Sequence, residues 1–406
     1  MPHYQPIQQI LLRLRLDFYI TLDNNTDNNS QRMHGESQMK IRIPRQDLLD
    51  NVNRAKTVIS SKTALPILSH LLLETGESAV RLSATDLKVS IECMVDCTVE
   101  EPGSCTVSSQ RLAMILSELP NSDVTMALGD NNVIHLSCGR IQTRLFSMPP
   151  EEFPPIRAFD NIEPLIFPQE MIKKMFMKTS FAICTDQARY NLTGLLFEIQ
   201  DGKLTVVATD GRRMSVCSER EGIPEGANLK VIIPGKMIGE LERLLGTEGE
   251  VSVYLDEAQT AFAFNNMRLV TAIIEGNFPN YEVVIPKKHD KEVVINTAAF
   301  TEAVRRTRTM TNEKFNNVRF ILSSGVLQLK VVTPEVGEYE EEISVEYDGD
   351  QVEIAFNPDF LLDILRNIDT EMVSLILKDT TSPGILKPCT DAASETYTNV
   401  VMPIRL

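Results

Sequence analysis

The sequence predicts an α+β fold built from three similar modules, each with two helices packed on antiparallel sheet. The first observation is a repeat of about 125 residues, because Thr85, Thr209 and Thr333 lie 124 residues apart in similar strand-like segments. The second is that each repeat contains two amphipathic stretches with apolar residues three and four apart. The third is that β-rich segments such as HLLLET, GLLFEIQ and QLKVVT separate these stretches. Helices and antiparallel strands within one repeat indicate a layered module.

Two further series of segments keep the same period. The first comprises KIRIPRQDLLDNV, PLIFPQEMIKKMF and VVINTAAFTEAVRR, anchored at Ile43, Phe167 and Ile295. The second comprises CTVSSQRLAMILSEL, VIIPGKMIGELERLL and IAFNPDFLLDILRNI, anchored at Val107, Ile233 and Phe356. Each segment is a short β-like run that ends at a polar or proline position and opens an amphipathic stretch, which marks the start of a helix.

The amphipathic stretches predict six helices, two in each module. We expect them at residues 45–56, 110–119, 169–179, 235–245, 301–310 and 358–368, the fifth beginning near Thr297. In the first helix, Leu48, Val52 and Ala55 fall at helical spacing. Pro44 stands at its entry, where a missing N–H costs little.

Length and composition agree with this division. A chain of 406 residues exceeds what one hydrophobic core supports, and a module of about 125 residues is near the commonest domain size. We expect domains at residues 39–162, 163–290 and 291–406. Residues 1–38 fall outside the repeats and are interpreted as a disordered extension, or as the product of a start codon assigned upstream of Met39.

The charge of the chain is unevenly distributed. The formal net charge is −16, which by itself argues against binding a polyanion. The six predicted helices, however, hold 13 Lys and Arg against 9 Asp and Glu. Cations on these helices could face phosphates, namely Lys173, Lys174, Lys178, Arg305, Arg306 and Arg308. The alternative for any single one of them is an ordinary solvated helix face.

Sequence motifs for catalysis or cofactor binding are missing. The five histidines show no metal-ligand spacing, Cys93 and Cys97 lack a second pair for zinc, and no glycine-rich phosphate loop occurs. The third copy of the repeated ATD segment reads VTPE, which argues against a shared catalytic aspartate. We therefore expect no enzyme activity, no cofactor and no metal. Seven scattered cysteines favour a reducing cytoplasm, and no apolar run reaches the roughly 18 residues of a membrane span.

From Met39 to Leu406 the chain resembles the bacterial replicative sliding clamp, the beta subunit of DNA polymerase III. The resemblance is carried by TALPILSHLLLE, FPPI, DQARYNLTGLLFE, TVVATDGRRMSV, GNFPNYEVVIP, TNEKFNNVR, DAAS and NVVMPIRL, in this order and at the threefold period. It implies three clamp domains and a head-to-tail homodimer that closes a ring around double-stranded DNA. The implied function is that of a processivity factor, which binds DNA without sequence specificity.

Helix geometry also favours two chains for such a ring. Six helices about 10 Å apart form a circle with an axis-to-axis diameter near 19 Å, which their own thickness nearly closes. Twelve helices leave roughly 28 Å clear, against a duplex whose groove depths sum to about 16 Å. Weakly basic helices would contact phosphates without reading bases, so that the ring could slide.

The resemblance also implies DNA-contact positions. Lys62 precedes TALPIL, Arg189 and Tyr190 lie in DQARYNL, and Arg111 is a further candidate. Asn191 replaces a second tyrosine that is common in the family, which weakens stacking on a base. The alternative for Tyr190 is a half-buried aromatic that covers the second pair of helices.

A partner-binding groove between the second and third domains is implied as well. It would receive short linear motifs from the DNA polymerase III alpha subunit, the clamp loader and repair proteins. The matching positions are Leu192, Thr209, Gly211, Arg212, Arg213, Met214, Pro279, Val283, Val284, Pro383, Val400, Val401, Met402, Pro403, Ile404, Arg405 and Leu406. The tail is unusually apolar for a chain end, and we expect it to dock partly as an edge strand. Glu282 stands where the family often has a basic residue.

The dimer interface is expected to pair residues 140–146 with residues 309–315. Leu145, Met310 and Phe315 are predicted to supply its apolar contacts. A different class of function stays open on sequence grounds: a β-rich scaffold that binds peptides and does not encircle DNA. Release from circular DNA upon linearisation would distinguish the two.

Overall fold

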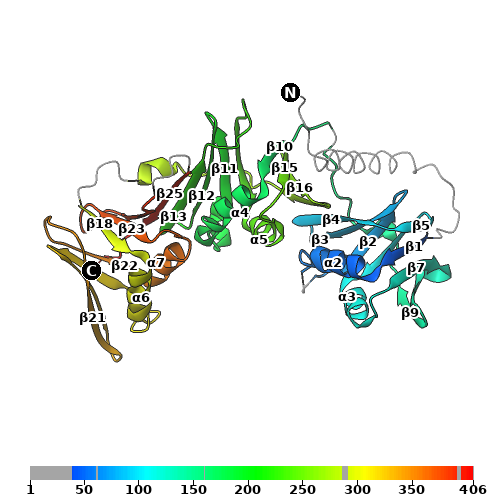
Figure 1. Ribbon diagram of the computed structural model, residues 1–406, viewed down its shortest axis with the longest axis horizontal. Helices are drawn as coiled ribbons and strands as arrows, with labels where there is room; N and C mark the ends of the chain where they lie inside the picture. The colour runs from blue at the N-terminus through cyan, green and yellow to red at the C-terminus, as the bar shows by residue number, and fades with distance from the viewer. Residues whose placement is uncertain (1–38, 61–62, 160, 286–290, 391–394, 406) are drawn as a thin grey trace, which may run out of the picture. The chain divides into compact units, whose positions relative to one another are not determined.

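The computed structural model describes residues 39–405 except 61–62, 160, 286–290 and 391–394 (Figure 1). The predicted extension at residues 1–38 lies outside the described residues. The chain divides into two compact units. Unit 1 contains the residues up to Gln169 together with Arg243–Ala272, and unit 2 contains Glu170–Glu242 together with the residues from Ile273 onward. Each unit is described by itself below.

The order of elements repeats three times, as the sequence predicts. The second and third modules each consist of a strand, a helix, four strands, a second helix and three strands, and the first module contains one additional short strand. Three modules of α+β architecture therefore make up the described chain. The predicted boundaries at 162/163 and 290/291 remain predictions.

Unit 1 contains two antiparallel sheets. The five-stranded sheet has the order β5 (Thr98–Glu101), β1 (Met39–Pro44), β7 (Asp123–Gly129), β8 (Val133–Cys138) and β9 (Ile141–Phe146). The eight-stranded sheet has the order β10 (Leu165–Pro168), β15 (Glu250–Leu255), β16 (Gln259–Phe264), β17 (Met267–Ala272), β4 (Val89–Asp96), β3 (Ala79–Thr85), β2 (His70–Thr75) and β6 (Ser104–Ser108). Helices α2 (Arg45–Lys56) and α3 (Ser109–Glu118) pack against each other, as Figure 1 shows.

The eight-stranded sheet of unit 1 joins the first module to part of the second. β17 pairs antiparallel with β4, so that Arg268 lies opposite Glu92. The Arg268 Nε donates a hydrogen bond of 2.6 Å to one oxygen of the Glu92 carboxylate. The Arg81 Nη1 lies 3.6 Å from the other oxygen of the same carboxylate. All three side chains are buried. Because a buried charge is costly without a partner, these ion pairs hold this strand junction in register.

Unit 2 repeats this plan. Its eight-stranded sheet has the order β14 (Leu229–Pro234), β11 (Gly194–Gln200), β12 (Lys203–Thr209), β13 (Arg213–Glu219), β25 (Glu395–Val401), β24 (Gly384–Pro388), β23 (Met372–Leu377) and β18 (Lys291–Asn296). Its four-stranded sheet has the order β21 (Gly337–Ser344), β20 (Val326–Thr333), β19 (Val318–Ser323) and β22 (Val352–Phe356). β25 of the third module pairs with β13 of the second, which corresponds to the junction in unit 1.

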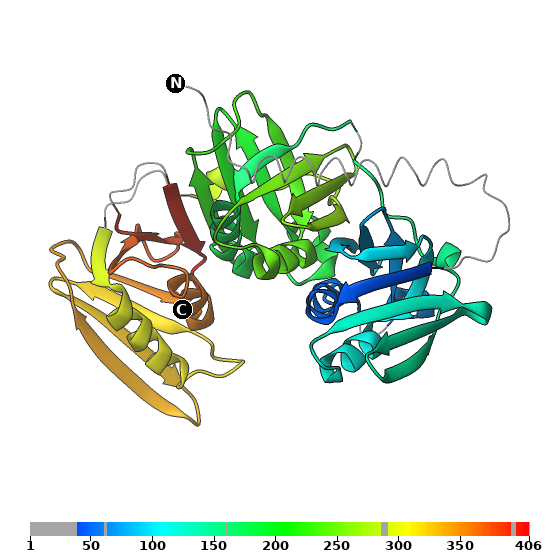
Figure 2. The same ribbon diagram turned by 45° about the vertical axis from the view of Figure 1, so that its right-hand side comes forward.

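The helices of unit 2 begin where the sequence supplies caps. In α6 (Thr297–Arg308) and α7 (Pro358–Leu365), the side chains of Asn296 and Asn357 accept hydrogen bonds from first-turn N–H groups. Figure 2 shows α6 and α7 beside the strands of the third module. In the core of this module, the Phe320 ring contacts the rings of Phe300 and Phe356 edge to face.

Helices α4 (Gln169–Met177) and α5 (Gly235–Leu244) belong to the second module. The predicted bounds are correct for α2 and differ by one or two residues for α3, α4 and α5. α6 begins at Thr297, directly after its Asn296 cap and where its start was expected, and it ends at Arg308, two residues before the predicted end. α7 ends at Leu365, three residues earlier than predicted.

The C-terminal strand is also not the edge strand that the sequence suggested. β25 lies between β13 and β24 in the interior of its sheet, and Val400 and Val401 are buried. This burial explains why the tail is apolar. None of the described helices combines the length and apolarity that a membrane crossing requires.

Candidate partner groove and interaction edges

A groove of about 150 Å³ opens in unit 2 beside the junction of β13 and β25. Nine of the predicted groove residues line it: Leu192, Thr209, Gly211, Arg213, Met214, Pro279, Val284, Val400 and Met402. Two lining residues, Asn280 and Tyr281, were missed. The signal for them was in the sequence, since FPNY at 278–281 repeats FPPI at 153–156.

The turn between β12 and β13 forms one side of the groove. Thr209 Oγ1 donates to the Arg213 carbonyl at 2.7 Å and accepts from the Gly211 N–H at 3.0 Å. Asp210 accepts from the backbone N–H groups of Arg212 and Arg213. Gly211 has a φ of +81°, which a glycine adopts at little cost. The turn is therefore rigid and places Thr209 and Gly211 at the rim.

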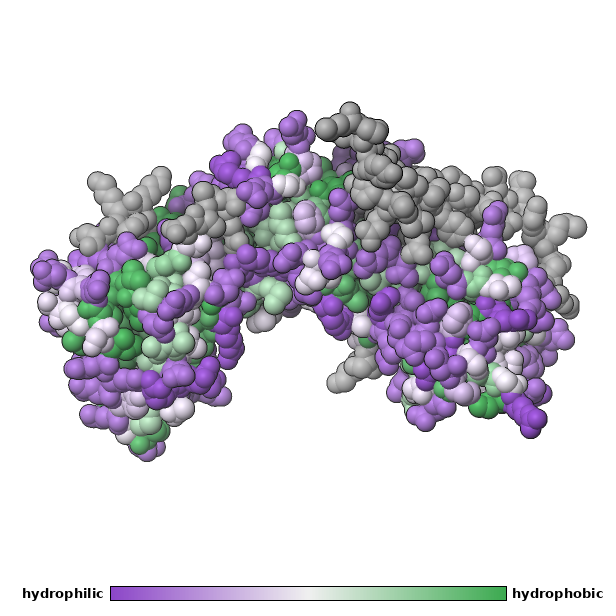
Figure 3. Space-filling view, viewed as in Figure 1, coloured by the Kyte–Doolittle hydropathy of each residue, from purple (hydrophilic) through white to green (hydrophobic). Residues whose placement is uncertain are grey.

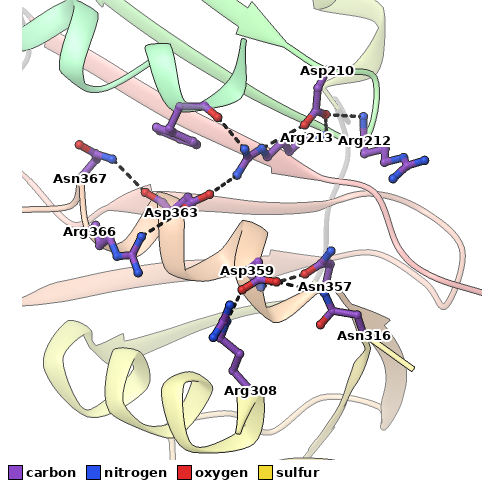
Figure 4. Close-up of polar contacts among 11 residues, drawn as sticks. Asp210, Arg212, Arg213, Arg308, Asn316, Asn357, Asp359, Asp363, Arg366 and Asn367 are labelled. Atoms are coloured by element: carbon purple, nitrogen blue, oxygen red, sulfur yellow. Dashed lines mark hydrogen bonds and ion pairs between the residues drawn. The ribbon is translucent and has the colours of Figure 1, made fainter. Parts of the chain in front are cut away.

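Arg213 anchors this turn to both neighbouring domains of unit 2 (Figure 4). Its Nε lies 3.2 Å from Asp210, and its Nη1 donates to Asp363 of α7 at 2.6 Å. Nη2 donates to the Phe181 carbonyl at 2.6 Å. The guanidinium lies 4.7 Å from the centroid of the Phe360 ring, which adds a cation–π contact. With its side chain 12% exposed, Arg213 is a positioning residue and contributes only one face to the groove.

The floor of the groove is continuous with a hydrophobic core. Met214 pairs with Val400 across the strand junction, and Leu192 packs into the same cluster. Met402, which is 40% exposed, follows β25, and its N–H donates to the Arg212 carbonyl at 2.8 Å. A fixed apolar floor with an exposed methionine at its rim suits the docking of apolar side chains.

The opposite side of the groove is the short helix η6 (Tyr281–Val284). Asn280 caps this helix by accepting from the Glu282 N–H. The Tyr281 hydroxyl donates to Glu198 at 3.3 Å, and Glu198 also binds Lys230. Burial, together with the neighbouring Glu198, raises the pKa of Tyr281, so that it stays a neutral donor.

The other described residues predicted for the groove are not among those that line it. Val283 is 74% exposed on η6, Arg212 is exposed in the turn, and Val401 is buried within β25. Pro383 precedes β24, and Ile404 forms a β-bridge with Ala355. Pro403 and Arg405 flank that bridge, and Leu406 lies outside the described residues.

The predicted DNA-contact residues are dispersed. Arg189, Tyr190 and Asn191 share the short helix η5 (Gln187–Leu192), which ends at the groove residue Leu192. Tyr190 is 56% exposed, and its role in DNA contact stays a prediction beside the half-buried alternative. Arg189 donates to the Asp210 carbonyl, and Asn191 donates to the Asn277 carbonyl at 3.0 Å.

Arg111 is exposed in the first turn of α3, and Lys62 lies outside the described residues. Several of the helix cations are engaged within the protein. Lys178 is buried with its ammonium 5.1 Å from the Tyr397 ring centroid, so its predicted availability to phosphate was wrong. Arg306 pairs with Glu341 and Arg308 pairs with Asp359.

Among the strands with a neighbour on a single side are β9 in unit 1 and β21 in unit 2. β9 is the last strand of the five-stranded sheet, and β21 is the last strand of the four-stranded sheet. Leu145 in β9 is partly exposed, and Phe146 next to it is 81% exposed. Met310 is partly exposed after α6, and Phe315 is 40% exposed. Figure 3 shows hydrophobic patches within a largely hydrophilic visible surface.

Metal chemistry finds no support in the described part of the chain. No three His, Cys, Asp or Glu side chains gather there in an arrangement that could hold an ion. The described cysteines are free thiols, and most of them are buried.

Three family models match consecutive parts of the chain. They describe the N-terminal domain of the DNA polymerase III beta subunit at residues 39–157, its central domain at 166–280 and its C-terminal domain at 282–405. The chain belongs to the DNA polymerase III beta subunit family.

Relatives of this beta subunit share its full length after the extension. The beta sliding clamp of Pseudomonas putida is 35% identical over 370 residues, which cover 91% of this chain and 100% of that protein. The beta sliding clamp of Chlamydia muridarum is 33% identical over 368 residues, covering 91% and 99%.

Solved structures agree with the fold of this beta subunit. The Pseudomonas aeruginosa DnaN sliding clamp bound to griselimycin matches with a TM-score of 0.85 at 34% identity, covering 91% of this chain and 100% of that one. The Bacillus subtilis sliding clamp matches in fold with a TM-score of 0.87 at 24% identity, with the same coverage. Members of this family are non-enzymatic processivity factors, and the reading of the chain as a clamp is thereby confirmed.

Proposed function

We propose that this beta subunit closes into a head-to-tail homodimeric ring around duplex DNA and tethers the replicative polymerase through the unit 2 groove. As a member of the clamp family the chain is a processivity factor. The proposal concerns the closed ring, the specific partner proteins and the residues that contact DNA, the second copy and those partners. The scaffold alternative is not favoured, because the family match spans all three domains.

The observation that carries the ring is the pairing pattern of the modules. The last strand of the second module, β17, pairs with β4, and the last strand of the third module, β25, pairs with β13. β4, β13 and β21 occupy the same place in their modules, and so do β9, β17 and β25. β9 and β21 are the remaining pair, so that a second copy would supply each with its neighbour.

The register of this contact follows from the two observed junctions. Thr271 lies opposite Val89, and Val401 lies opposite Arg213. Transferred to the free edges, this register places Leu145 opposite the partner's Gly337.

A Cβ on Gly337 would lie 3.5 Å from the Met310 side chain, so Leu145 and Met310 would meet there, as the sequence predicted. The same register sets Arg144 opposite Glu338, an opposite-charge pair. Phe315 is proposed at the rim of this contact.

The groove is proposed to receive short linear motifs of the DNA polymerase III alpha subunit, the clamp loader and repair proteins. Its support is the exposed Met402 over a fixed apolar floor, which fits an apolar anchor residue. Arg189, Tyr190, Asn191, Arg111 and Lys62 are proposed as non-specific DNA contacts, and the cytoplasm as the site of action.

The ring is tested by loading the protein with a clamp loader onto nicked circular DNA. We expect the protein to stay on the circle at high salt and to leave when the circle is cut, because an encircling ring slides off ends. Retention on linear DNA would contradict encirclement.

Light scattering tests the dimer separately. We expect Leu145→Asp and Met310→Asp to give monomers, whereas Leu65→Asp, at an exposed leucine before β2, should leave the dimer intact. Dimers in all three variants would refute this placement of the interface.

A further inference from the structure

A second pocket lies in unit 1 at the position that corresponds to the groove of unit 2. Its volume is about 120 Å³. It is lined by Thr85, Leu87, Lys88, Ser90, Pro154, Pro155, Ile156, Arg157, Gln259, Val270, Thr271 and Ala272. Its turn, its strand junction and its proline segment each correspond to a part of the groove, one module earlier in the chain, whereas Leu192 of the groove has no counterpart in this lining.

The strand pairing establishes this correspondence. Thr271 lies opposite Val89 in unit 1, just as Val401 lies opposite Arg213 in unit 2. The neighbouring lining residues then correspond one to one: Thr85 to Thr209, Leu87 to Gly211, Ser90 to Met214, Val270 to Val400 and Ala272 to Met402. The proline segment 153–157 corresponds to 278–282, which forms the opposite side of the groove.

The turns at the two sites share their hydrogen bonds. Asp86 accepts from the N–H groups of Lys88 and Val89, as Asp210 does from those of Arg212 and Arg213. The Leu87 N–H donates to Thr85 Oγ1 at 3.0 Å. The corresponding hydrogen bond in unit 2, from the Gly211 N–H to Thr209 Oγ1, is also 3.0 Å long. The backbone frame of a groove is therefore present in unit 1, with a different set of side chains.

The floor of the second pocket is more polar. Serine and alanine replace the two methionines of the groove at Ser90 and Ala272. The strand register also aligns Gln259 with Pro383, because Thr260 and Gly384 lie opposite Thr271 and Val401. Gln259 Oε1 is buried and accepts no hydrogen bond within the described chain. An unmatched acceptor at this depth favours a ligand with an N–H or O–H donor.

The rim of the second pocket combines one apolar and one cationic side chain. Leu87 adopts a φ of +73° and is 60% exposed, at the position where the groove has Gly211. A leucine in this conformation is strained, and strain of this kind concentrates at binding sites. Lys88 is exposed and forms no salt bridge within the described residues, whereas Arg157 is held by Asp256 at 2.8 Å.

We propose that this pocket is a second docking site, which takes a short extended peptide from a partner protein. The peptide would carry an amide or hydroxyl side chain that donates to Gln259, an aliphatic side chain against Leu87 and a carboxylate at Lys88. An apolar contact beside a buried amide acceptor suits a peptide better than a nucleic acid, whose phosphates bring no donor. The site does not depend on ring closure or on occupancy of the groove.

Labelled hexapeptides test this assignment with the full-length protein. The set places Leu, Gln and Glu in every order and spacing, with Ala elsewhere, and binding is measured by fluorescence anisotropy. We expect at least one peptide to bind with a Kd of about 100 μM or tighter. Leu87→Gly should weaken it at least tenfold without loss of folding, because glycine is the residue of the matching turn in unit 2.

Two further variants separate the outcomes. Lys88→Glu, at an exposed position, should weaken the same peptide, and Met402→Ala in the groove should leave it unchanged. The proposal is overturned if no peptide in the set binds more tightly than about 1 mM. It is equally overturned if Met402→Ala abolishes binding while Leu87→Gly does not, or if single-stranded DNA competes for the site.

Discussion

Replacing Arg213 with alanine tests how the domains of unit 2 are joined. Arg213 donates to Asp363 and to the Phe181 carbonyl at 2.6 Å each, lies 3.2 Å from Asp210 and stacks on Phe360. Truncating one partner of a buried ion pair costs about 3–5 kcal/mol when the other charge is left alone.

The cost should be lower here, because both acids keep other partners. Asp210 still accepts from two backbone N–H groups, and Asp363 still accepts from Arg366 at 2.9 Å. The Phe181 carbonyl and the face of the Phe360 ring do lose their contacts. We therefore expect a loss of about 2 kcal/mol, which is roughly a thirtyfold rise in local opening.

Native-state hydrogen exchange measures this opening strand by strand. Exchange in peptides from β13 and β25 should accelerate about thirtyfold in Arg213→Ala. Arg213→Lys should recover only part of the protection, because one ammonium group cannot reproduce the planar set of donors that a guanidinium offers. Arg212→Ala is the matched control, since its side chain is exposed. Equal exchange in Arg213→Ala and Arg212→Ala would refute the assigned role.

Three smaller predictions concern buried and titrating groups. Glu92→Ala should destabilise unit 1 by about 3 kcal/mol in thermal unfolding, because Arg268 and Arg81 both lose this buried carboxylate, although Arg81 keeps its ion pair with Glu74 at 3.0 Å; a negligible change would contradict this. Burial raises the pKa of Cys93 to about 12, so iodoacetamide at pH 8 should alkylate the exposed Cys389 before Cys93 in the native protein. Equal alkylation rates for the two thiols would contradict the burial of Cys93. Hydrogen bonds from Arg306 lower the pKa of Glu341, so the pair stabilises the fold above the unfolded pKa of the carboxyl and loses this effect as pH falls. Glu341→Gln should therefore lower stability at pH 7 and not at about pH 3, and the same loss at both would argue against the pair.

Local sequence patterns predicted the elements and the repeat well. α2 has its predicted bounds because its apolar spacing and the proline that precedes it are both local features of the sequence. Nine groove residues could be assigned because the family resemblance applies position by position in the turn at 209–214 and in the tail.

Contacts between distant segments could not be predicted in the same way. β17 pairs with β4, and β25 with β13, across about 180 residues without any local signal. The prediction of an edge strand at the tail was wrong for this reason. Lys178 has the sequence context of a solvated helix cation, and only the packing of Tyr397 against it shows that it is buried.

The most direct test of the ring is a covalent closure across its proposed seam. Arg144 and Glu338 are both exposed and would lie opposite each other in an antiparallel pair, within the Cα spacing that a disulfide spans. Arg144→Cys/Glu338→Cys protein, loaded on nicked circular DNA and oxidised, should form a protein ring that stays on the circle in denaturant and comes off when the DNA is cut. Oxidised protein that leaves intact circles in denaturant, or that forms no cross-link between copies, would contradict the account.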